Sequence, residues 1–218
     1  MKTVPLDNLE EKYVRLSMNE VSLLKEIKSP HVIELIDAFI ANNILHVALE
    51  LIDGNDLGVR INIMRDRGTI FSERTIWYKF HQICAGLQHL HEKRIIHRGF
   101  YMSPERNKGG GYHFQSDIWS LGCLLYELCI FRSPFNGKSS NAYSLHKKIN
   151  YGDIVPFPMK VYSDHLVYFT YACLNTKPEE RSTADERASA SLAMYNHFQQ
   201  MLANYKALFA KPLSKKPY

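Results

Sequence analysis

The sequence predicts an α+β fold in which one helix and a β-hairpin precede a mostly helical body. Residues 10–28 carry apolar side chains at helical spacing, and residues 44–51 alternate apolar and polar side chains as a half-buried strand does. After residue 72, apolar side chains recur every three or four positions in several longer stretches, which is typical of amphipathic helices.

The first part of the chain shows clear ends for its elements. Ser29 and Pro30 end the first helix, because the residue before a proline avoids helical backbone angles. Two strands are expected at about residues 32–39 and 44–51, and residues 41–43 suit the turn between them. We therefore predict a first domain over residues 1–52.

The second part is predicted to be helical. Ser72 suits the N-cap of a long helix, and a second apolar helix is expected over about residues 117–130. These elements belong to a predicted domain over residues 53–183. Residues 184–218 are predicted to form a C-terminal helix and a basic tail. The apolar stripe of that helix is Leu192, Tyr195, Phe198, Leu202, Tyr205 and Phe209. We expect this stripe to pack on the chain's own helical body, with a partner-binding helix or a short coiled coil as the alternative.

Composition excludes several classes of protein. The 218 residues carry 27 Lys and Arg against 22 Asp and Glu, so the net charge of +5 is mild. It is spread along the chain and predicts neither nucleic acid nor a membrane as a partner. No apolar run reaches the roughly 18 residues that span a bilayer, and no secretory signal is evident. The four cysteines form no CxxC pair, so we expect buried thiols in a cytoplasmic or nuclear protein rather than a zinc site.

Several stretches carry a family resemblance. They are SPHVIELIDAFI at 29–40, HVALELIDGNDL at 46–57, LQHLHEKRIIHR at 87–98, YMSPER at 101–106, FQSDIWSLGCLLYEL at 114–128 and PEERST at 178–183. In this order they resemble a eukaryotic protein kinase, specifically the NIMA-related serine/threonine kinases, over residues 10–183. The resemblance implies a partial N-lobe, made of the αC helix and a β-hairpin, and a mostly helical C-lobe. It also implies ATP and magnesium as the cofactors of the family.

In the N-lobe, the resemblance assigns four positions to nucleotide binding. Glu20 stands where the αC glutamate holds the lysine of the third kinase strand, and Lys2 is the candidate for that lysine. A solvated helix glutamate is the alternative interpretation of Glu20. Glu50 and Leu51 fall at the hinge, whose backbone binds adenine in the family. The chain begins near that third strand and contains no GxGxxG, so we expect no phosphate-binding loop.

Other positions correspond to residues that hold the kinase fold together. They are Leu24, Leu35, Glu105, Asp117, Trp119 and Arg181. Leu24 and Leu35 resemble members of the hydrophobic spine. The resemblance implies that Glu105 pairs with a buried Arg181 and that Asp117 holds the backbone of the catalytic loop. Breaking such a buried pair costs about 3–5 kcal/mol.

The catalytic loop is where the sequence departs from the family. His97 and Arg98 are the first two residues of a His-Arg-Asp motif, but Gly99 replaces the aspartate, and no catalytic residue remains. Loss of a general base slows a reaction by about 10²–10⁴-fold. We expect His97 to be a packed, hydrogen-bonded structural residue.

Directly after Phe100 the chain runs into YMSPER, so the metal-binding and activation segments are missing. Arg98 and Tyr101 are three residues apart, so their Cα atoms lie at most about 11 Å from each other.

These departures predict a catalytically inactive, pseudokinase-like binding or scaffold protein with no cofactor of its own. Its expected partners are proteins, such as a full-length NIMA-related kinase or the regulators of one, in cytoplasmic, nuclear or microtubule-associated settings. One alternative is an isoform, or an incomplete form, of an active ATP-dependent serine/threonine kinase. Another is an unstable chain that has no function.

Overall fold

The computed structural model describes residues 1–7, 9–135, 141–158 and 160–210. The chain divides into two compact units, Met1–Asp56 and Leu57–Tyr218. The division falls four residues after the predicted boundary at 52, and the C-terminal helix, predicted as a separate segment, belongs to the second unit. The predicted α+β class, a small sheet followed by a helical body, is confirmed.

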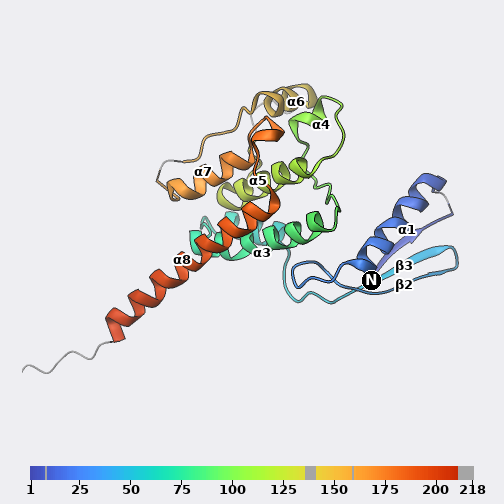
Figure 1. Cartoon of the computed structure of the whole chain (residues 1–218), viewed down its shortest axis with the longest axis horizontal. Helices are drawn as coiled ribbons and strands as arrows, with labels where there is room; N and C mark the ends of the chain where they lie inside the picture. The colour runs from blue at the N-terminus through green and yellow to red at the C-terminus, as the bar shows by residue number, and fades with distance from the viewer. Residues whose placement is uncertain (8, 136–140, 159, 211–218) are drawn as a thin grey trace, which may run out of the picture. The chain divides into compact units, whose positions relative to one another are not determined.

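The first unit is one helix on a small antiparallel sheet (Figure 1). Helix α1 spans Glu11–Glu26, and the strands are β1 (Lys2–Pro5), β2 (Leu35–Ala41) and β3 (Ile44–Leu49), in the order β1-β3-β2. The predicted hairpin is therefore present as β2 and β3. Asn42 and Asn43 form its turn with φ of 50° and 58°, the left-handed backbone that asparagine tolerates. Strand β1 was not predicted, and it turns the hairpin into a three-stranded sheet.

The core of this unit follows from the two periodicities. Leu45 and Val47 of β3 are buried because alternate residues of a strand share a face. Val21 of α1 packs on them, with Val4 and Leu35 partly buried at the edges. The helix thus covers one face of the sheet, and β1 is held beside β3 by their antiparallel pairing.

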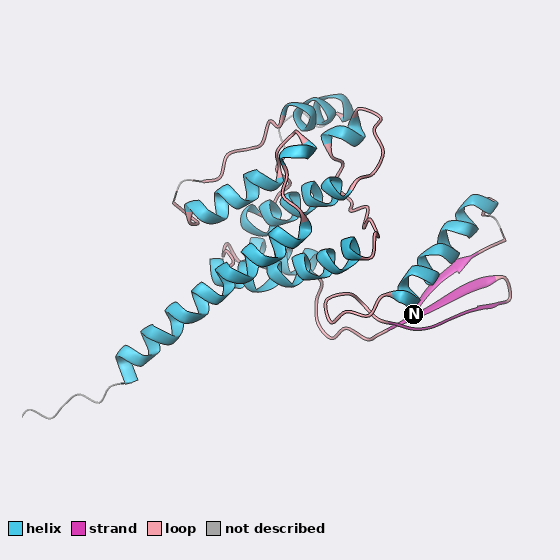
Figure 2. Cartoon of the chain, in the orientation of Figure 1, coloured by secondary structure: helices cyan, strands magenta, loops and turns pink. Residues whose placement is uncertain are grey.

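The described residues of the second unit form helices joined by loops, as Figure 2 shows. Its helices are α2 (Leu57–Asp66), α3 (Glu73–Glu92), α4 (Pro104–Asn107), α5 (Phe114–Ile130), α6 (Ala142–Tyr151), α7 (Asp164–Cys173) and α8 (Ala184–Ala210), with a short 3₁₀ turn, η1 (Pro178–Glu180). The predicted N-cap is confirmed, since the Ser72 hydroxyl accepts a hydrogen bond from Thr75 N.

Helix α5 is the centre of the second unit. Its buried side chains face two hydrophobic clusters, one shared with α3, α7 and α8 and the other with α6. Gly122 permits the contact with α7, because a Cβ there would lie 2.6 Å from the Cβ of Cys173. The predicted burial of the thiols is also confirmed: Cys84, Cys123, Cys129 and Cys173 are free and buried.

Helix α8 runs antiparallel to α3. Hydrogen bonds join Gln88 to Asp185 near one end of the contact and Arg74 to Gln199 near the other. Tyr195 and Phe198 pack against the main cluster, so the predicted packing of this helix on its own body is confirmed for them.

The other residues of the predicted apolar stripe on α8 are not all buried against the helical body. Leu192 is 45% exposed, while the Phe209 side chain and the tail 211–218 lie outside the described residues.

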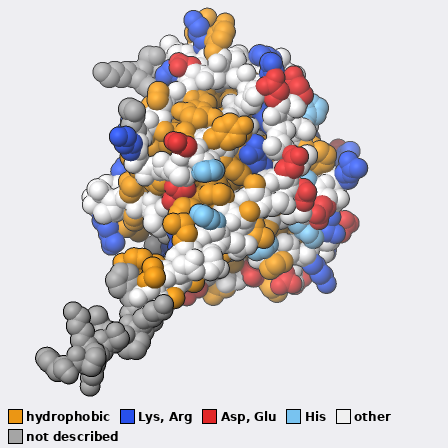
Figure 3. Space-filling view, turned by 60° about the vertical axis from the view of Figure 1, so that its left-hand side comes forward, with side chains coloured by type: hydrophobic (Ala, Val, Ile, Leu, Met, Phe, Trp, Pro, Cys, Tyr) orange, Lys and Arg blue, Asp and Glu red, His pale blue; other side chains and the backbone are white. Residues whose placement is uncertain are grey.

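Figure 3 shows hydrophobic side chains gathered in the middle of one face of the molecule. Within the described ranges, no helix combines the length and apolar character needed to cross a bilayer.

Candidate functional site

The first group of candidate residues lies in the first unit. Lys2 of β1 pairs with Val47 in the sheet, and its Nζ lies 3.0 Å from Oε1 of Glu20 on α1. Both side chains are more than half exposed, so the ion pair contributes about 1 kcal/mol or less. The structure therefore brings together the two residues that the resemblance assigns to a lysine–glutamate pair, in a solvated position.

Two spine candidates and two hinge candidates belong to the same unit. Leu35 packs partly buried against the small core, and Leu24 lines a small hollow beside Lys2 and Glu20. Glu50 follows β3, and it is tied to Glu34 twice: its backbone N–H donates to the Glu34 carbonyl, and its carboxylate accepts from the Glu34 N–H, both at 2.9 Å. Leu51, the next residue, is 95% exposed.

In the second unit, Asp117 holds the remnant of the catalytic loop. It lies in the first turn of α5 and is buried, and its two carboxylate oxygens accept hydrogen bonds from the backbone N–H groups of His97 and Arg98, at 2.8 and 2.9 Å. Nε2 of His91, at the end of α3, lies 2.9 Å from the same carboxylate. Three polar groups thus satisfy a buried charge, which would otherwise be costly.

The expectation that His97 is packed is wrong. The residue is exposed, and the bond that fixes it comes from its backbone rather than its imidazole. Arg98, next in the chain, has φ of 58°, a left-handed backbone that turns the chain toward α5. The two hydrogen bonds from the backbone N–H groups of His97 and Arg98 to the Asp117 carboxylate, called the Asp117 clamp below, support this turn.

The junction after Arg98 lies directly against α5. A Cβ at Gly99 would lie 2.8 Å from Cβ and 2.9 Å from Oγ of Ser120. Ser120 Oγ donates to the carbonyl of Tyr101 at 3.1 Å, and the Tyr101 hydroxyl donates to Glu127, also on α5. Burial, together with this bond, raises the pKa of Tyr101 well above its ordinary range. The position of the missing aspartate therefore has no space for a side chain unless the junction or Ser120 moves.

Glu105 and Arg181 form a bidentate ion pair. The two guanidinium nitrogens lie 2.9 and 2.8 Å from the two carboxylate oxygens, and Ser116 Oγ donates to the same carboxylate at 2.8 Å. The Arg181 side chain is fully buried, and it also donates hydrogen bonds to the backbone carbonyls of Gln115 and Asn175. Burial alone would raise the pKa of Glu105, but the bonds from Arg181 and Ser116 outweigh it and lower the pKa to about 2.

Trp119 completes this cluster. It is buried and stacks on Phe135 with ring centroids 5.4 Å apart, while the Arg181 guanidinium lies 5.1 Å from its ring. The structure thus brings Glu105, Arg181 and Trp119 into one structural cluster beside the Asp117 clamp. None of them is positioned on an exposed surface where a reacting group would bind.

Sequence reasoning missed three residues of these networks. His91 contacts Asp117, Ser116 bonds Glu105, and Ser120 closes the junction. Ser116 and Ser120 are four residues apart on α5, so they lie on the same face of that helix, the face toward the junction and α4. Once α5 was predicted, this spacing could have indicated that the two serines act on the same side. Among the described residues, no group of three or more His, Cys, Asp or Glu side chains is arranged to hold a metal ion.

Comparison with known proteins gives two matches to the protein kinase domain, over residues 1–100 and 99–192. They meet at residues 99 and 100, which is the junction beside Ser120. A probable serine/threonine-protein kinase nek2 of Dictyostelium discoideum is 27% identical over 94% of this chain and 58% of its own length. Serine/threonine-protein kinase Nek3 of Mus musculus is 31% identical over 77% of the chain and 40% of its own length. Serine/threonine-protein kinase Nek9 of Xenopus laevis is 30% identical over 85% of the chain and 23% of its own length. The chain thus spans about a quarter to just over half of the length of these relatives.

Proposed function

The chain belongs to the protein kinase domain family, with NIMA-related serine/threonine kinases as its relatives, and we propose that it is a kinase-like binding or scaffold protein that does not itself transfer phosphate. One observation carries the proposal. At Gly99, where the resemblance places the catalytic aspartate, a Cβ would lie 2.8 Å from Ser120, and the chain continues directly into the segment that leads to α4. Glycine offers no group that accepts a proton.

The family cofactors do not fit this junction. Phosphoryl transfer uses a carboxylate near the nucleophilic hydroxyl and further acids that hold magnesium. The residues between His97 and Pro104 contain no acid, and the first acid that follows, Glu105, is occupied by Arg181 and Ser116. We therefore propose that the chain works without ATP or magnesium as a catalytic cofactor.

The intact structural networks favour a folded binding protein over a decayed remnant. The Asp117 clamp and the Glu105–Arg181 pair stabilise the helical unit even though the junction lacks catalytic groups. The sequence similarity to NIMA-related kinases supports protein partners that bind such a kinase. We propose such partners, including the full-length kinase or its regulators, in a cytoplasmic, nuclear or microtubule-associated setting.

A second function is favoured by the Lys2–Glu20 pair. Its 3.0 Å contact matches the pair that active kinases use to position phosphates, so a form of the protein that also carried the absent segments would be an ATP-dependent serine/threonine kinase. The intact mass of the endogenous protein distinguishes the two proposals. A species larger than this chain by several dozen residues supports the kinase, and a species of 25.3 kDa supports the binding protein.

The proposal is tested by phosphoryl transfer. The purified chain is incubated with labelled ATP, magnesium and a generic serine/threonine substrate, with a NIMA-related kinase as the positive control. We expect incorporation equal to the no-protein control for the chain and for its Gly99→Asp variant, because the added carboxylate meets Ser120 and finds no metal-binding partners. Incorporation that rises with the concentration of the chain would refute the proposal.

A further inference from the structure

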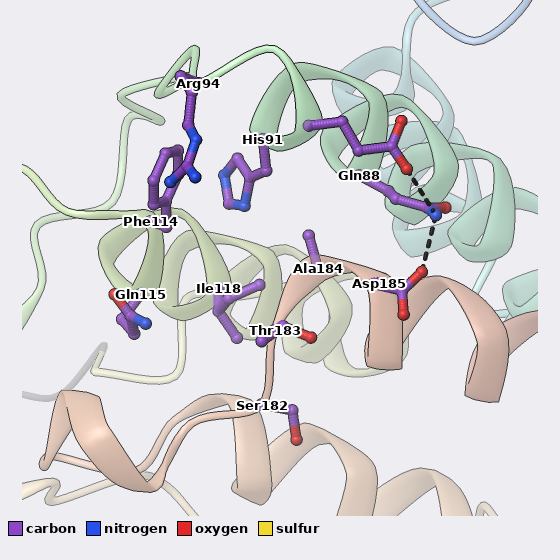
Figure 4. A pocket seen from close by; sticks show the side chains of 11 residues that line it. Gln88, His91, Arg94, Phe114, Gln115, Ile118, Ser182, Thr183, Ala184 and Asp185 are labelled. Carbon is purple, nitrogen blue, oxygen red and sulfur yellow. Dashed lines mark hydrogen bonds between the residues drawn. The ribbon is translucent and has the colours of Figure 1, made fainter.

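A pocket of about 340 Å³ opens on the helical unit and is built mainly from three segments (Figure 4). The end of α3 supplies Gln88, His91 and Glu92, the start of α5 supplies Phe114 and Ile118, and the first turn of α8 supplies Asp185. Pockets for small molecules usually measure about 300–1,000 Å³. This one is at the lower end of that range, so it suits a single side chain rather than a large cofactor.

One end of the pocket is acidic. The Gln88 side-chain amide donates to Oε1 of Glu92 at 3.1 Å and to Oδ1 of Asp185 at 2.8 Å, which Figure 4 marks with dashed lines. Because both oxygens contact one nitrogen, they are at most about 6 Å apart, a separation at which like charges repel. Among the described residues, no Lys, Arg or His nitrogen lies within ion-pair distance of either carboxylate. The neutral side-chain amide of Gln88 is therefore the group that lies between the carboxylates of Glu92 and Asp185.

The remainder of the pocket has a different chemistry. Phe114 and Ile118 provide apolar surface, and Figure 4 shows Arg94 beside Phe114, away from Asp185. The pocket is thus negative at one end, lined in the middle by Ile118 and by the imidazole of His91, which is bonded to Asp117, and closed at the other end by Phe114 and the positive Arg94. That order matches an arginine residue within a peptide, whose guanidinium group, aliphatic stem and backbone carbonyl follow in the same sequence.

The walls are fixed before any ligand arrives. Arg181 is held by Glu105 and by two carbonyls, which positions the residues that follow it at the start of α8. Thr183 and Glu186 then cap that helix reciprocally, each bonding the other's backbone N–H. A pocket organised in this way loses little conformational entropy on binding.

We propose that this pocket binds an arginine side chain of a partner protein. The guanidinium group donates to Glu92 and Asp185, its stem lies on Phe114 and Ile118, and the carbonyl of the arginine residue accepts from Arg94. Arginine fits better than lysine, because a planar group with five donors can reach two carboxylates at once. The inference holds whether or not the chain transfers phosphate, since none of these residues belongs to the junction at Gly99.

The test is an NMR titration of the full chain with a blocked tripeptide, acetyl-Gly-Arg-Gly-amide, and with the same peptide carrying Gln or Lys in place of Arg. We expect saturable shifts with the arginine peptide, weaker binding with lysine and none with glutamine. Asp185→Asn and Glu92→Gln should each weaken binding by about tenfold, the factor expected for losing one charge-assisted hydrogen bond.

Glu179→Gln is the matched control, because it removes the same charge from an exposed residue outside the pocket, and it should leave the affinity unchanged. Melting curves of all three variants establish that they are folded, and Glu92, at the exposed end of α3, provides a test that does not alter α8. Equal shifts with the arginine and glutamine peptides, equal binding of arginine and lysine, or a loss as large in Glu179→Gln would overturn the assignment.

Discussion

Replacing Glu105 by glutamine tests the ion pair that holds α4 against the rest of the helical unit. Glutamine keeps the size of the side chain and can still accept hydrogen bonds, but it leaves the fully buried Arg181 guanidinium without a negative partner. Removing one member of a buried pair costs about 3–5 kcal/mol. The pKa of Glu105 gives a similar figure: a fall from 4.5 to about 2 corresponds to roughly 3 kcal/mol.

The same shift predicts how this cost depends on pH. Because the folded pKa is lower than the unfolded one, the stabilisation is complete above about pH 5 and is lost as the pH falls through 4.5 toward 2. The free energy of unfolding of wild type should therefore exceed that of Glu105→Gln by about 3 kcal/mol near pH 7 and by about half of that near pH 3.

Urea denaturation at both pH values, followed by circular dichroism, measures these differences. Glu179→Gln serves as the control, since its exposed carboxylate should give a difference of less than about 0.5 kcal/mol at either pH. A difference for Glu105→Gln below about 1 kcal/mol at neutral pH, or one that does not change with pH, would refute the reasoning.

Three further predictions concern the junction, the Asp117 hydrogen bonds and the buried thiols. Gly99→Ala should lower the free energy of unfolding by about 1–3 kcal/mol, because its Cβ meets Ser120, whereas Gly111→Ala, whose Cβ would have no neighbour closer than 3.9 Å, should cost less than about 1 kcal/mol. Equal losses in these two variants would argue against a close contact at the junction. Asp117→Asn should cost about 2–3 kcal/mol, since two N–H groups lose a charged acceptor, and an unchanged melting temperature would contradict the clamp. The four cysteines should resist alkylation until the chain unfolds, because burial raises their pKa values, that of Cys173 to about 11; rapid labelling of the native protein would show that they are accessible.

The parts of the fold that could be predicted are those with strong local signals. The hairpin was predictable because Asn42 and Asn43 tolerate the left-handed backbone of a tight turn between two alternating strands. Ser72 at the start of α3 and the apolar spacing along α5 were equally clear. The Glu105–Arg181 pair joins residues 76 positions apart, and only the family resemblance could have brought them together.

Other elements carry signals that were weaker or were overlooked. Strand β1 has four residues, too few for an alternating pattern to show, and its place is set by pairing with β3. Helix α7 could have been found, because Ser163 caps it and its buried side chains recur at helical spacing. Helix α6 ends at Gly152 with φ of 65°, a typical C-cap.

The candidate site shows the limit of reasoning from sequence more sharply. The loss of an aspartate at Gly99 is visible in the sequence, but the closeness of Ser120 is a tertiary contact across 21 residues that no local pattern reports. The exposure of His97 was mispredicted for the same reason, since the bond that fixes this residue is made by its backbone to Asp117. The pocket at the ends of α3 and α5 depends on three segments meeting in space, which no local sequence pattern indicates.

Binding of Mg-ATP, measured as a change in melting temperature, tests the central claim most directly, because the described residues contain no cluster of acidic side chains arranged to hold the metal, and without metal the nucleotide should not be retained. A ligand present at about 100 times its dissociation constant stabilises a protein by about 2.7 kcal/mol, which moves the melting temperature by several degrees. We predict no change with ATP in the presence or absence of magnesium. A magnesium-dependent rise that saturates with ATP, and that is lost when Glu20 is replaced by glutamine, would contradict the account.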